Sequence, residues 1–177
     1  MENEGTSGKI QIWTIGHSNR TAENFVNILK THKIELLADV RSFPGSKRYP
    51  HFNKNSLDIT LAQNFIEYLH IPELGGKRGP AGNISNTERA ALKTYSRYME
   101  TDSFLKGINL LGNILQVKRT ALMCAEARWR DCHRSLISDF LNLRKIEVIH
   151  IIDESRTEKH TYPNSPGLFT GEEKSTL

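Results

Sequence analysis

Apolar positions along the chain follow two spacings, one typical of buried strands and the other typical of amphipathic helices. Short apolar runs predict strands at residues 9–18, 34–40, 65–70, 119–126 and 146–153. Apolar residues at helical spacing predict helices at 21–33, 56–64 and 131–145, and two more within 86–116. Strands that alternate with helices favour a single-domain, three-layer α/β sandwich with a mainly parallel sheet of about five strands.

Residue types at the ends of these elements help to set their limits. Thr21 and Asp131 stand where the N-caps of the first and last helices belong. Prolines, glycines and charged residues dominate the end of the chain. We therefore expect a flexible N-terminus over residues 1–8, one α/β domain over 9–160, and a loosely ordered tail over 161–177.

Polar and chemically reactive residues gather where the predicted strands end. They are His17, Ser18 and Asn19 after the first strand, Asp39, Arg41 and Ser42 at the second, and Cys124 and Glu126 at the fourth. In open α/β sheets, ligands bind in the crevice beyond the carboxyl ends of the strands. The sequence therefore predicts an active or binding site at this edge of the sheet.

Basic residues are clustered, although the net charge is only +4. The segment from Arg41 to Lys54 has four Lys or Arg residues and no acid, and aromatic residues lie between them. Sites for single-stranded nucleic acid combine such cations with rings on which bases stack. The predicted contacts are Lys47, Arg48, Tyr49 and Phe52. The alternatives are a solvated basic face and rings that anchor the loop to the core.

Several classes of protein are not expected. The chain has no run of about 18 apolar residues, so we predict no contact with a membrane. Residues 1–9 lack the basic and apolar parts of a secretory leader, and two cysteines do not make a disulfide framework. A cytoplasmic location is therefore expected. No motif predicts a cofactor.

The segment "MCAEARWRDCHRS", residues 123–135, contains both cysteines of the chain. The seven residues between Cys124 and Cys132 do not match the ligand spacing of a zinc site, and we predict no metal there. Cys124 and Arg130 have the Cys-x5-Arg spacing of tyrosine phosphatases, but the loop between them lacks a glycine. Cys124 as a small apolar strand residue is the alternative.

The same segment also suggests an anion pocket. With Asp131 as N-cap, the amides of the first helical turn would be available to an anion. Cys132, His133 and Arg134 would then contact a phosphate or carboxylate, with Arg134 as a bidentate donor. The alternative is that Arg134 pairs with Asp131 or Glu126 and locks the loop.

The motifs resemble those of the domain of unknown function 488 (DUF488) family. The motifs are "TIGHSNR", "DVRSFPGS", "LGGKR", "LMCAE" followed by "CHRSLIS", and then "VIHI", in that order between about Ile12 and His160. The resemblance implies a compact α/β domain with no settled activity. It points to His17, Ser18, Asn19, Asp39, Arg41, Ser42, Gly75, Gly76, Glu126, Cys132, His133 and Arg134, and to His160 as a further candidate.

The leading functional prediction is an enzyme that acts on a nucleotide, nucleic acid or other phosphate-containing ligand. Hydrolysis or transfer at a nucleoside or sugar carbon would use Glu126 and Asp39 as carboxylates and His17 to move a proton. Arg41 and Arg134 would bind the anion. For Asp39, an equally open alternative is that it holds Arg41 or caps a loop amide. Two other functions stay open: a non-catalytic nucleic-acid-binding module, and a cysteine enzyme of phosphatase-like or sulfurtransferase-like type.

Overall fold

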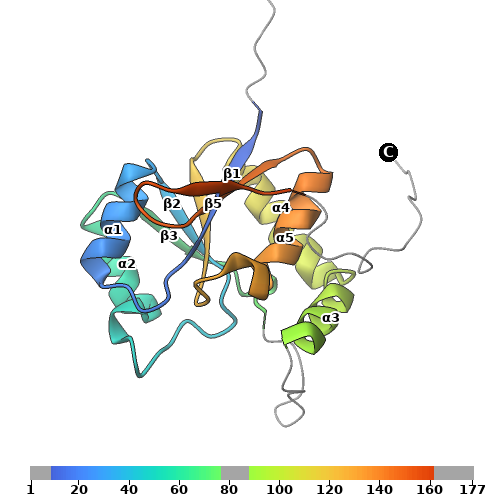
Figure 1. Cartoon of the computed structure of the whole chain (residues 1–177), viewed down its shortest axis with the longest axis horizontal. Helices are drawn as coiled ribbons and strands as arrows, with labels where there is room; N and C mark the ends of the chain where they lie inside the picture. Colours follow the sequence, from blue (N-terminus) through green and yellow to red (C-terminus); the bar gives the residue numbers. More distant parts are fainter. Residues whose placement is uncertain (1–8, 77–87, 162–177) are drawn as a thin grey trace, which may run out of the picture.

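The computed structural model describes residues 9–76 and 88–161. A six-stranded sheet forms its middle layer (Figure 1). The strands lie in the order β3-β2-β4-β1-β5-β6. Five run parallel: β1 (Gln11–Gly16), β2 (Leu36–Asp39), β3 (Glu67–His70), β4 (Thr120–Cys124) and β5 (Glu147–Ile151). The sixth, β6 (Thr157–Lys159), is antiparallel to β5. The predicted α/β sandwich is confirmed.

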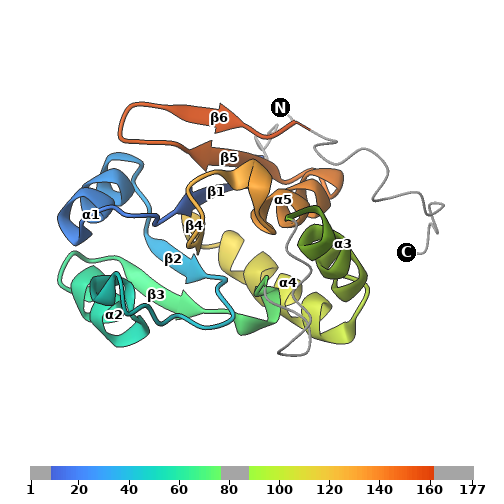
Figure 2. The ribbon, with the colours of Figure 1, turned by 60° about the horizontal axis from the view of Figure 1, so that its bottom comes forward.

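Helices cover both faces of the sheet, which makes three layers (Figure 2). On one face lie α1 (Ala22–Thr31) and α2 (Lys54–Ala62), and on the other lie α3 (Glu88–Tyr98), α4 (Asp102–Leu115) and α5 (Arg134–Leu143). Each face has its own apolar core. In the described parts of the chain, none of the helices has the length and apolarity needed to cross a bilayer.

The two helix caps predicted from the sequence have different outcomes. Thr21 caps α1, because its hydroxyl accepts a hydrogen bond from the amide of Asn24 at 3.1 Å. The prediction for Asp131 is wrong, since this residue ends a 3-10 turn (Trp129–Asp131) and its carboxylate pairs with Arg128 at 2.7 Å. The first turn of α5 begins three residues later, at Arg134, without a cap from Asp131.

The connections of β1 and β4 leave the sheet on opposite faces. These strands are neighbours, but β1 leads into α1 on one face and β4 leads towards α5 on the other. Such a change of direction opens a crevice at the carboxyl edge of a parallel sheet. Two backbone hydrogen bonds hold the strand exits side by side there, from His17 to the Cys124 carbonyl at 2.9 Å and from Ser18 to the Ala125 carbonyl at 3.0 Å.

Some predictions fall on residues outside the described ranges. These are the flexible terminus at 1–8, the tail beyond Thr161, and Lys77 and Arg78 at the end of the "LGGKR" motif. Strand β6 was not predicted, because three exposed or half-buried residues with the sequence Thr-Glu-Lys carry no apolar pattern.

Candidate functional site

A cavity of about 820 Å³ opens at the carboxyl edge of the sheet, where β1, β2 and β4 end. Its walls come from the segments after these three strands, from the start of α5 and from α3. The residues with reactive or polar side chains on its walls include His17, Ser18, Asn19, Arg41, Ser42, Tyr49, Tyr95, Cys124, Glu126, Cys132 and His133. The structure therefore brings predicted site residues from four parts of the chain together around one cavity.

Arg41 is fixed in the wall of the cavity by Asp39. Its Nε and Nη2 donate to the Asp39 carboxylate at 2.9 and 2.6 Å, and its backbone amide donates to the same carboxylate at 3.0 Å. Nη2 also donates to the Phe52 carbonyl at 2.8 Å. The remaining nitrogen, Nη1, lies 3.3 Å from Nε2 of His17. The guanidinium is therefore held with one terminal nitrogen directed along the cavity wall.

Asp39 itself lies beneath the cavity and does not line it. Its side chain has no exposed surface, and it also accepts a hydrogen bond from Tyr68 Oη at 2.7 Å. Burial and the Asp39 charge raise the pKa of Tyr68, so this hydroxyl stays a donor. The catalytic role predicted for Asp39 does not fit this position. The alternative interpretation of Asp39 does fit: its carboxylate holds the Arg41 side chain and also accepts a hydrogen bond from the Arg41 backbone amide.

His17 is a neutral side chain at the junction of β1 and β4. Nδ1 donates to the Ser18 carbonyl at 2.9 Å, which leaves Nε2 as the acceptor facing Arg41. Burial lowers the pKa of His17 to about 4, against the opposing effect of the bond to Ser18. Its ring stacks on Phe52 with 4.3 Å between centroids. A neutral imidazole with a fixed tautomer can accept a proton at Nε2.

Ser18, beside His17, has a φ angle of 51°, in the left-handed region that serine seldom adopts. Gly16, one residue before His17, packs tightly against the exit of β4. A Cβ atom at Gly16 would lie 1.8 Å from the carbonyl oxygen of Glu126. The first strand can therefore reach the cavity only with a glycine at this position.

The glycines of the "LGGKR" motif have a similar role. A Cβ atom at Gly75 would lie 2.4 Å from Oγ of Ser42, and one at Gly76 would lie 2.3 Å from Nδ1 of His133. Both contacts are shorter than any Cβ atom tolerates. The motif therefore allows the backbone to pass directly against two residues of the cavity wall. Nε2 of His133 donates to the Val40 carbonyl at 3.2 Å, which orients the ring.

Arg134 lies away from the cavity, contrary to its predicted contact with an anion. Its side chain is buried, with 1% exposed, and it does not line the cavity. Nη2 donates to the backbone carbonyl of Glu126 at 2.6 Å, and Nε lies 3.3 Å from Sγ of Cys132. The alternative prediction fits in part: Arg134 holds the loop through the Glu126 backbone carbonyl, and in the described parts of the chain it forms no ion pair with Asp131 or Glu126.

Two backbone amides at the start of α5, where the anion pocket was predicted, already have acceptors within the chain. The amide of Arg134 donates to Cys132 Sγ at 3.4 Å, and that of Ser135 donates to the Cys132 carbonyl at 2.9 Å. Cys132 therefore accepts hydrogen bonds from two of the amides that an anion at this helix start would contact. Burial opposes ionisation of Cys132, yet the bond from Cys124 and the charge of Arg134 lower its pKa to about 6.

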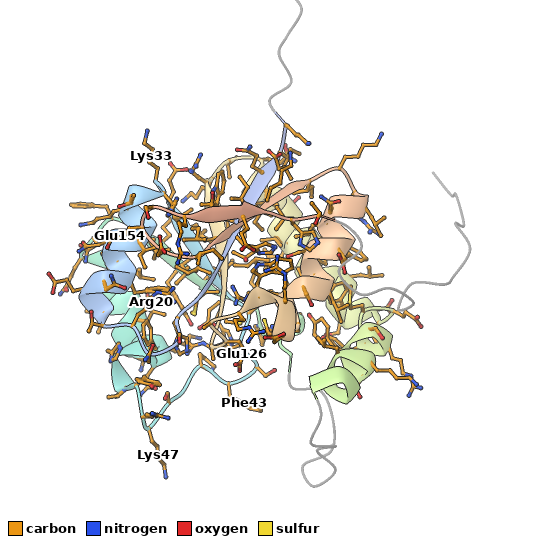
Figure 3. All side chains as sticks on the ribbon, in the orientation of Figure 1. Arg20, Lys33, Phe43, Lys47, Glu126 and Glu154 are labelled. Carbon is orange, nitrogen blue, oxygen red and sulfur yellow. The ribbon has the colours of Figure 1, made fainter. Side chains whose placement is uncertain are left out.

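Glu126 is an exposed carboxylate on the rim of the cavity. Figure 3 shows it on the same edge of the molecule as Phe43 and Lys47, well separated from Glu154. Phe43 lines the cavity with 78% of its surface exposed. An exposed carboxylate and an exposed ring therefore flank the entrance.

The predicted nucleic-acid contacts divide into two groups. Lys47 and Arg48 are exposed, and Tyr49 is half-buried in the cavity wall with the Arg48 guanidinium 5.4 Å from its ring centroid. The prediction for Phe52 is wrong, because this ring has no exposed surface and packs on Phe25 in the core. Phe52 anchors the loop and cannot stack on a base.

Two further candidates lie outside the cavity. Arg130 pairs with Glu158 at 3.0 Å and stacks on Trp129, so it does not complete a phosphatase loop around Cys124. His160 is buried between Asp139 and His150, at 2.8 and 2.9 Å. It belongs to a buried polar network that also includes His150, whose Nδ1 lies 2.7 Å from Oγ1 of Thr14.

Sequence reasoning missed Tyr95, which lines the cavity from α3 and donates to the Leu74 carbonyl at 2.8 Å. Its position in a helical apolar stripe gave no sign of this, since such residues usually belong to the core. In the parts of the chain that the structure describes, no three His, Cys, Asp or Glu side chains form a group that could hold a metal ion.

The fold and the cavity define an α/β protein with a set of reactive side chains at the carboxyl edge of a parallel sheet. The chain belongs to the DUF488 family, described as a domain of unknown function, whose model matches residues 21–141. This range contains Asp39, Arg41 and Cys132 but begins after His17, so the "TIGHSNR" motif lies outside it. Neither the curated proteins nor the solved structures include a significant match.

Proposed function

We propose that this protein is an enzyme acting on a phosphate-containing ligand of nucleotide size that binds in the strand-end cavity. The observation that carries the proposal is Arg41, a buried cation with a fixed orientation on the cavity wall. Because Asp39 and the Phe52 carbonyl hold Nε and Nη2, the orientation of Nη1 costs little entropy when an anion binds. Charge-assisted hydrogen bonds from such a donor are stronger than neutral ones.

The size and lining of the cavity support a ligand with an aromatic part. A volume of about 820 Å³ falls within the range of roughly 300–1,000 Å³ that is usual for sites of small molecules. Phe43 and Tyr49 contribute accessible rings to the lining, and Phe43 has 78% of its surface exposed. Stacking of a base on an aromatic ring is worth about 1–3 kcal/mol.

The chemistry that we propose is hydrolysis or transfer at a sugar carbon, with Glu126 as the carboxylate. Its exposed position on the cavity rim would let it stabilise positive charge that develops on the sugar or activate a water molecule. Nε2 of His17 would accept a proton nearby. Asp39 has only a positioning role in this proposal, because it lies beneath Arg41.

A non-catalytic nucleic-acid-binding module is the second candidate, and the exposed cations of the loop after β2 favour it. Lys47 and Arg48 project from that loop, and Phe43 is exposed beside the cavity. Binding through such cations would weaken steeply as salt is added.

The test is calorimetric titration of the full chain with nucleoside monophosphates, the matching nucleosides and single-stranded oligonucleotides, at several salt concentrations. We expect the monophosphates to bind, the nucleosides to bind at least about 10-fold more weakly, and Arg41→Lys to lose about 10-fold or more in affinity. Preference for oligonucleotides with strong salt dependence would favour the second candidate. Equal binding of nucleoside and monophosphate would contradict the role of Arg41.

Turnover is tested with Glu126→Gln against Glu154→Gln as the matched control. Both residues are exposed glutamates, and Glu154 lies far from Glu126 in Figure 3. The monophosphates that bind are incubated with each variant and analysed by chromatography for release of the base. We expect release by the wild type and by Glu154→Gln, and loss of at least about 100-fold in Glu126→Gln. Unchanged release in Glu126→Gln would remove the proposed mechanism.

A further inference from the structure

Both cysteines of the chain meet at the wall of the cavity. Cys124 ends β4, and Cys132 precedes α5 after a short turn. Their Sγ atoms are 3.4 Å apart, and both residues line the cavity. An S–S bond of about 2.05 Å therefore needs only a small movement of the two side chains.

Arg134 provides the second observation. A guanidinium that is 1% exposed requires a compensating negative charge, because an isolated buried charge is very costly. In the described parts of the chain, no carboxylate forms an ion pair with Arg134. Its side-chain contacts are two backbone carbonyls, of Glu126 and Ala127, and the sulfur of Cys132. Of these acceptors, only the sulfur can carry a full negative charge.

The contact between Cys132 and Arg134 repeats the contact between Asp39 and Arg41. In each case the arginine follows its acceptor by two residues, and both its amide and its Nε donate to that acceptor. The distances to Asp39 Oδ1 are 3.0 and 2.9 Å, and those to Cys132 Sγ are 3.4 and 3.3 Å. The longer distances suit the larger sulfur atom. The sulfur thus takes the place of a carboxylate.

We propose that Cys132 and Cys124 form a redox-active dithiol that is oxidised by a hydroperoxide entering the cavity. The Cys132 thiolate attacks the terminal, hydrogen-bearing oxygen of the peroxide, the O–O bond breaks, and Cys132 becomes a sulfenic acid. The hydroxide or alkoxide that leaves takes up a proton from solvent and becomes water or an alcohol. The Cys124 sulfur then attacks the Cys132 sulfur, its proton leaves with the hydroxyl group as water, and the disulfide forms. The peroxide is the oxidant, and the two thiols are oxidised by two electrons.

The roles of the two cysteines follow from their surroundings. Cys132 has Nε of Arg134 at 3.3 Å and lies 3.4 Å from Sγ of Cys124, which can donate a hydrogen bond to it, so Cys132 is the attacking sulfur. Burial raises the pKa of Cys124 well above its ordinary value, so Cys124 stays a thiol until Cys132 is oxidised. This inference does not depend on the nucleotide proposal, since it uses the cavity only as the route of the peroxide.

The first experiment uses the full chain, reduced and then exposed to hydrogen peroxide. We expect the loss of both thiols in a thiol titration and a monomer lighter by two hydrogen atoms in intact mass spectrometry, both reversed by dithiothreitol. In Cys124→Ser, Cys132 should give a dimedone adduct. In Cys132→Ser, Cys124 should stay reduced. Two intact thiols in the wild type after a dose of peroxide that fully oxidises free cysteine would overturn the proposal, as would disulfides only between chains.

A charge-rescue series keeps the proposal testable if Cys132→Ser folds poorly. Cys132→Asp supplies a fixed negative charge to Arg134, whereas Cys132→Ser and Cys132→Ala supply none. We expect Cys132→Asp to have a higher midpoint of thermal unfolding than either of the other variants. If Cys132→Ala is as stable as Cys132→Asp or more so, Cys132 carries no charge in the folded protein and the proposed attacking thiolate is wrong. Failure to bind nucleotides would leave both experiments unaffected.

Discussion

Asp39→Asn should strongly destabilise the protein. The change keeps the size of the side chain but removes the charge that Arg41 contacts through Nε and Nη2. Both residues are buried, with 0% and 7% of the side chain exposed. Removing one partner of a buried ion pair costs about 3–5 kcal/mol, because the other charge is left without compensation. One amide hydrogen bond, from the Arg41 backbone, can survive at the Asn oxygen.

Tyr68 adds a further part to this cost. Its hydroxyl donates to the same carboxylate oxygen that accepts Nη2 of Arg41, at 2.7 Å. In Asp39→Asn, the NH2 group of the amide would face either Tyr68 Oη or Arg41 Nη2, and it cannot accept a hydrogen bond from that donor. We therefore expect a loss of roughly 4 kcal/mol in the free energy of unfolding, a large part of the roughly 5–15 kcal/mol that holds a domain of this size folded.

The assay is urea unfolding at pH 7, followed by tryptophan fluorescence and by circular dichroism. Asp58→Asn is the matched control, since Asp58 lies exposed on α2, and its change should stay within about 0.5 kcal/mol. A double-mutant cycle with Tyr68→Phe separates the contribution of the phenol. If Asp39→Asn unfolds within about 1 kcal/mol of the wild type, the ion pair does not hold Arg41, and the argument for a fixed cation fails.

Further predictions concern pH and two glycines. Burial lowers the pKa of His17 to about 4 and that of His150 to about 2. Below pH 6.5 the unfolded chain therefore binds more protons than the folded one, and the free energy of unfolding should fall as the pH drops. Urea titrations at pH 7, 6 and 5 measure this. The pKa of Cys132 is lowered from 9.0 to about 6, so its stabilising contribution is complete above pH 9 and is lost as the pH falls towards 6; Cys132→Ser should abolish that slope. Gly16→Ala should cost more than about 3 kcal/mol in the same assay, because its Cβ would lie 1.8 Å from a backbone oxygen. Gly112→Ala on α4, where a Cβ atom meets nothing within 4 Å, should instead stabilise the protein by about 0.5–1 kcal/mol.

The sequence predicts the carboxyl edge of the sheet well because the same short pattern recurs at each strand. Each parallel strand is a short apolar run, and the polar residues after it must lie at the shared carboxyl edge. That argument brought His17, Arg41 and Glu126 to one place, and all three line the cavity. Strand β6 escaped prediction because an edge strand of three polar residues needs no apolar pattern.

The failed predictions concern side chains whose direction depends on distant contacts. Phe52 lies in a basic loop, but Pro50 begins a 3-10 turn there that brings the ring into the core. Arg134 lies at a helix start that favours anions, yet its side chain turns under the loop after β4 to reach the Glu126 carbonyl. Residue spacing predicts neither side-chain orientation, because each depends on how a neighbouring loop packs in the folded protein.

The two buried arginines show how one local arrangement can produce two kinds of chemistry. Arg41 follows Asp39 by two residues, Arg134 follows Cys132 by two residues, and each donates its amide and Nε backwards to that acceptor. A carboxylate keeps its charge and its chemistry fixed, so Arg41 is a permanent cation at the cavity wall. A thiolate in the same position, as we propose for Cys132, would lose its charge on oxidation. The cavity wall thus carries a fixed cation, Arg41, and also Cys132, whose charge would depend on its oxidation state in the proposed dithiol. Any effect of peroxide on ligand binding should therefore arise at Cys132, which lines the cavity, and leave the contact between Arg41 and Asp39 unchanged.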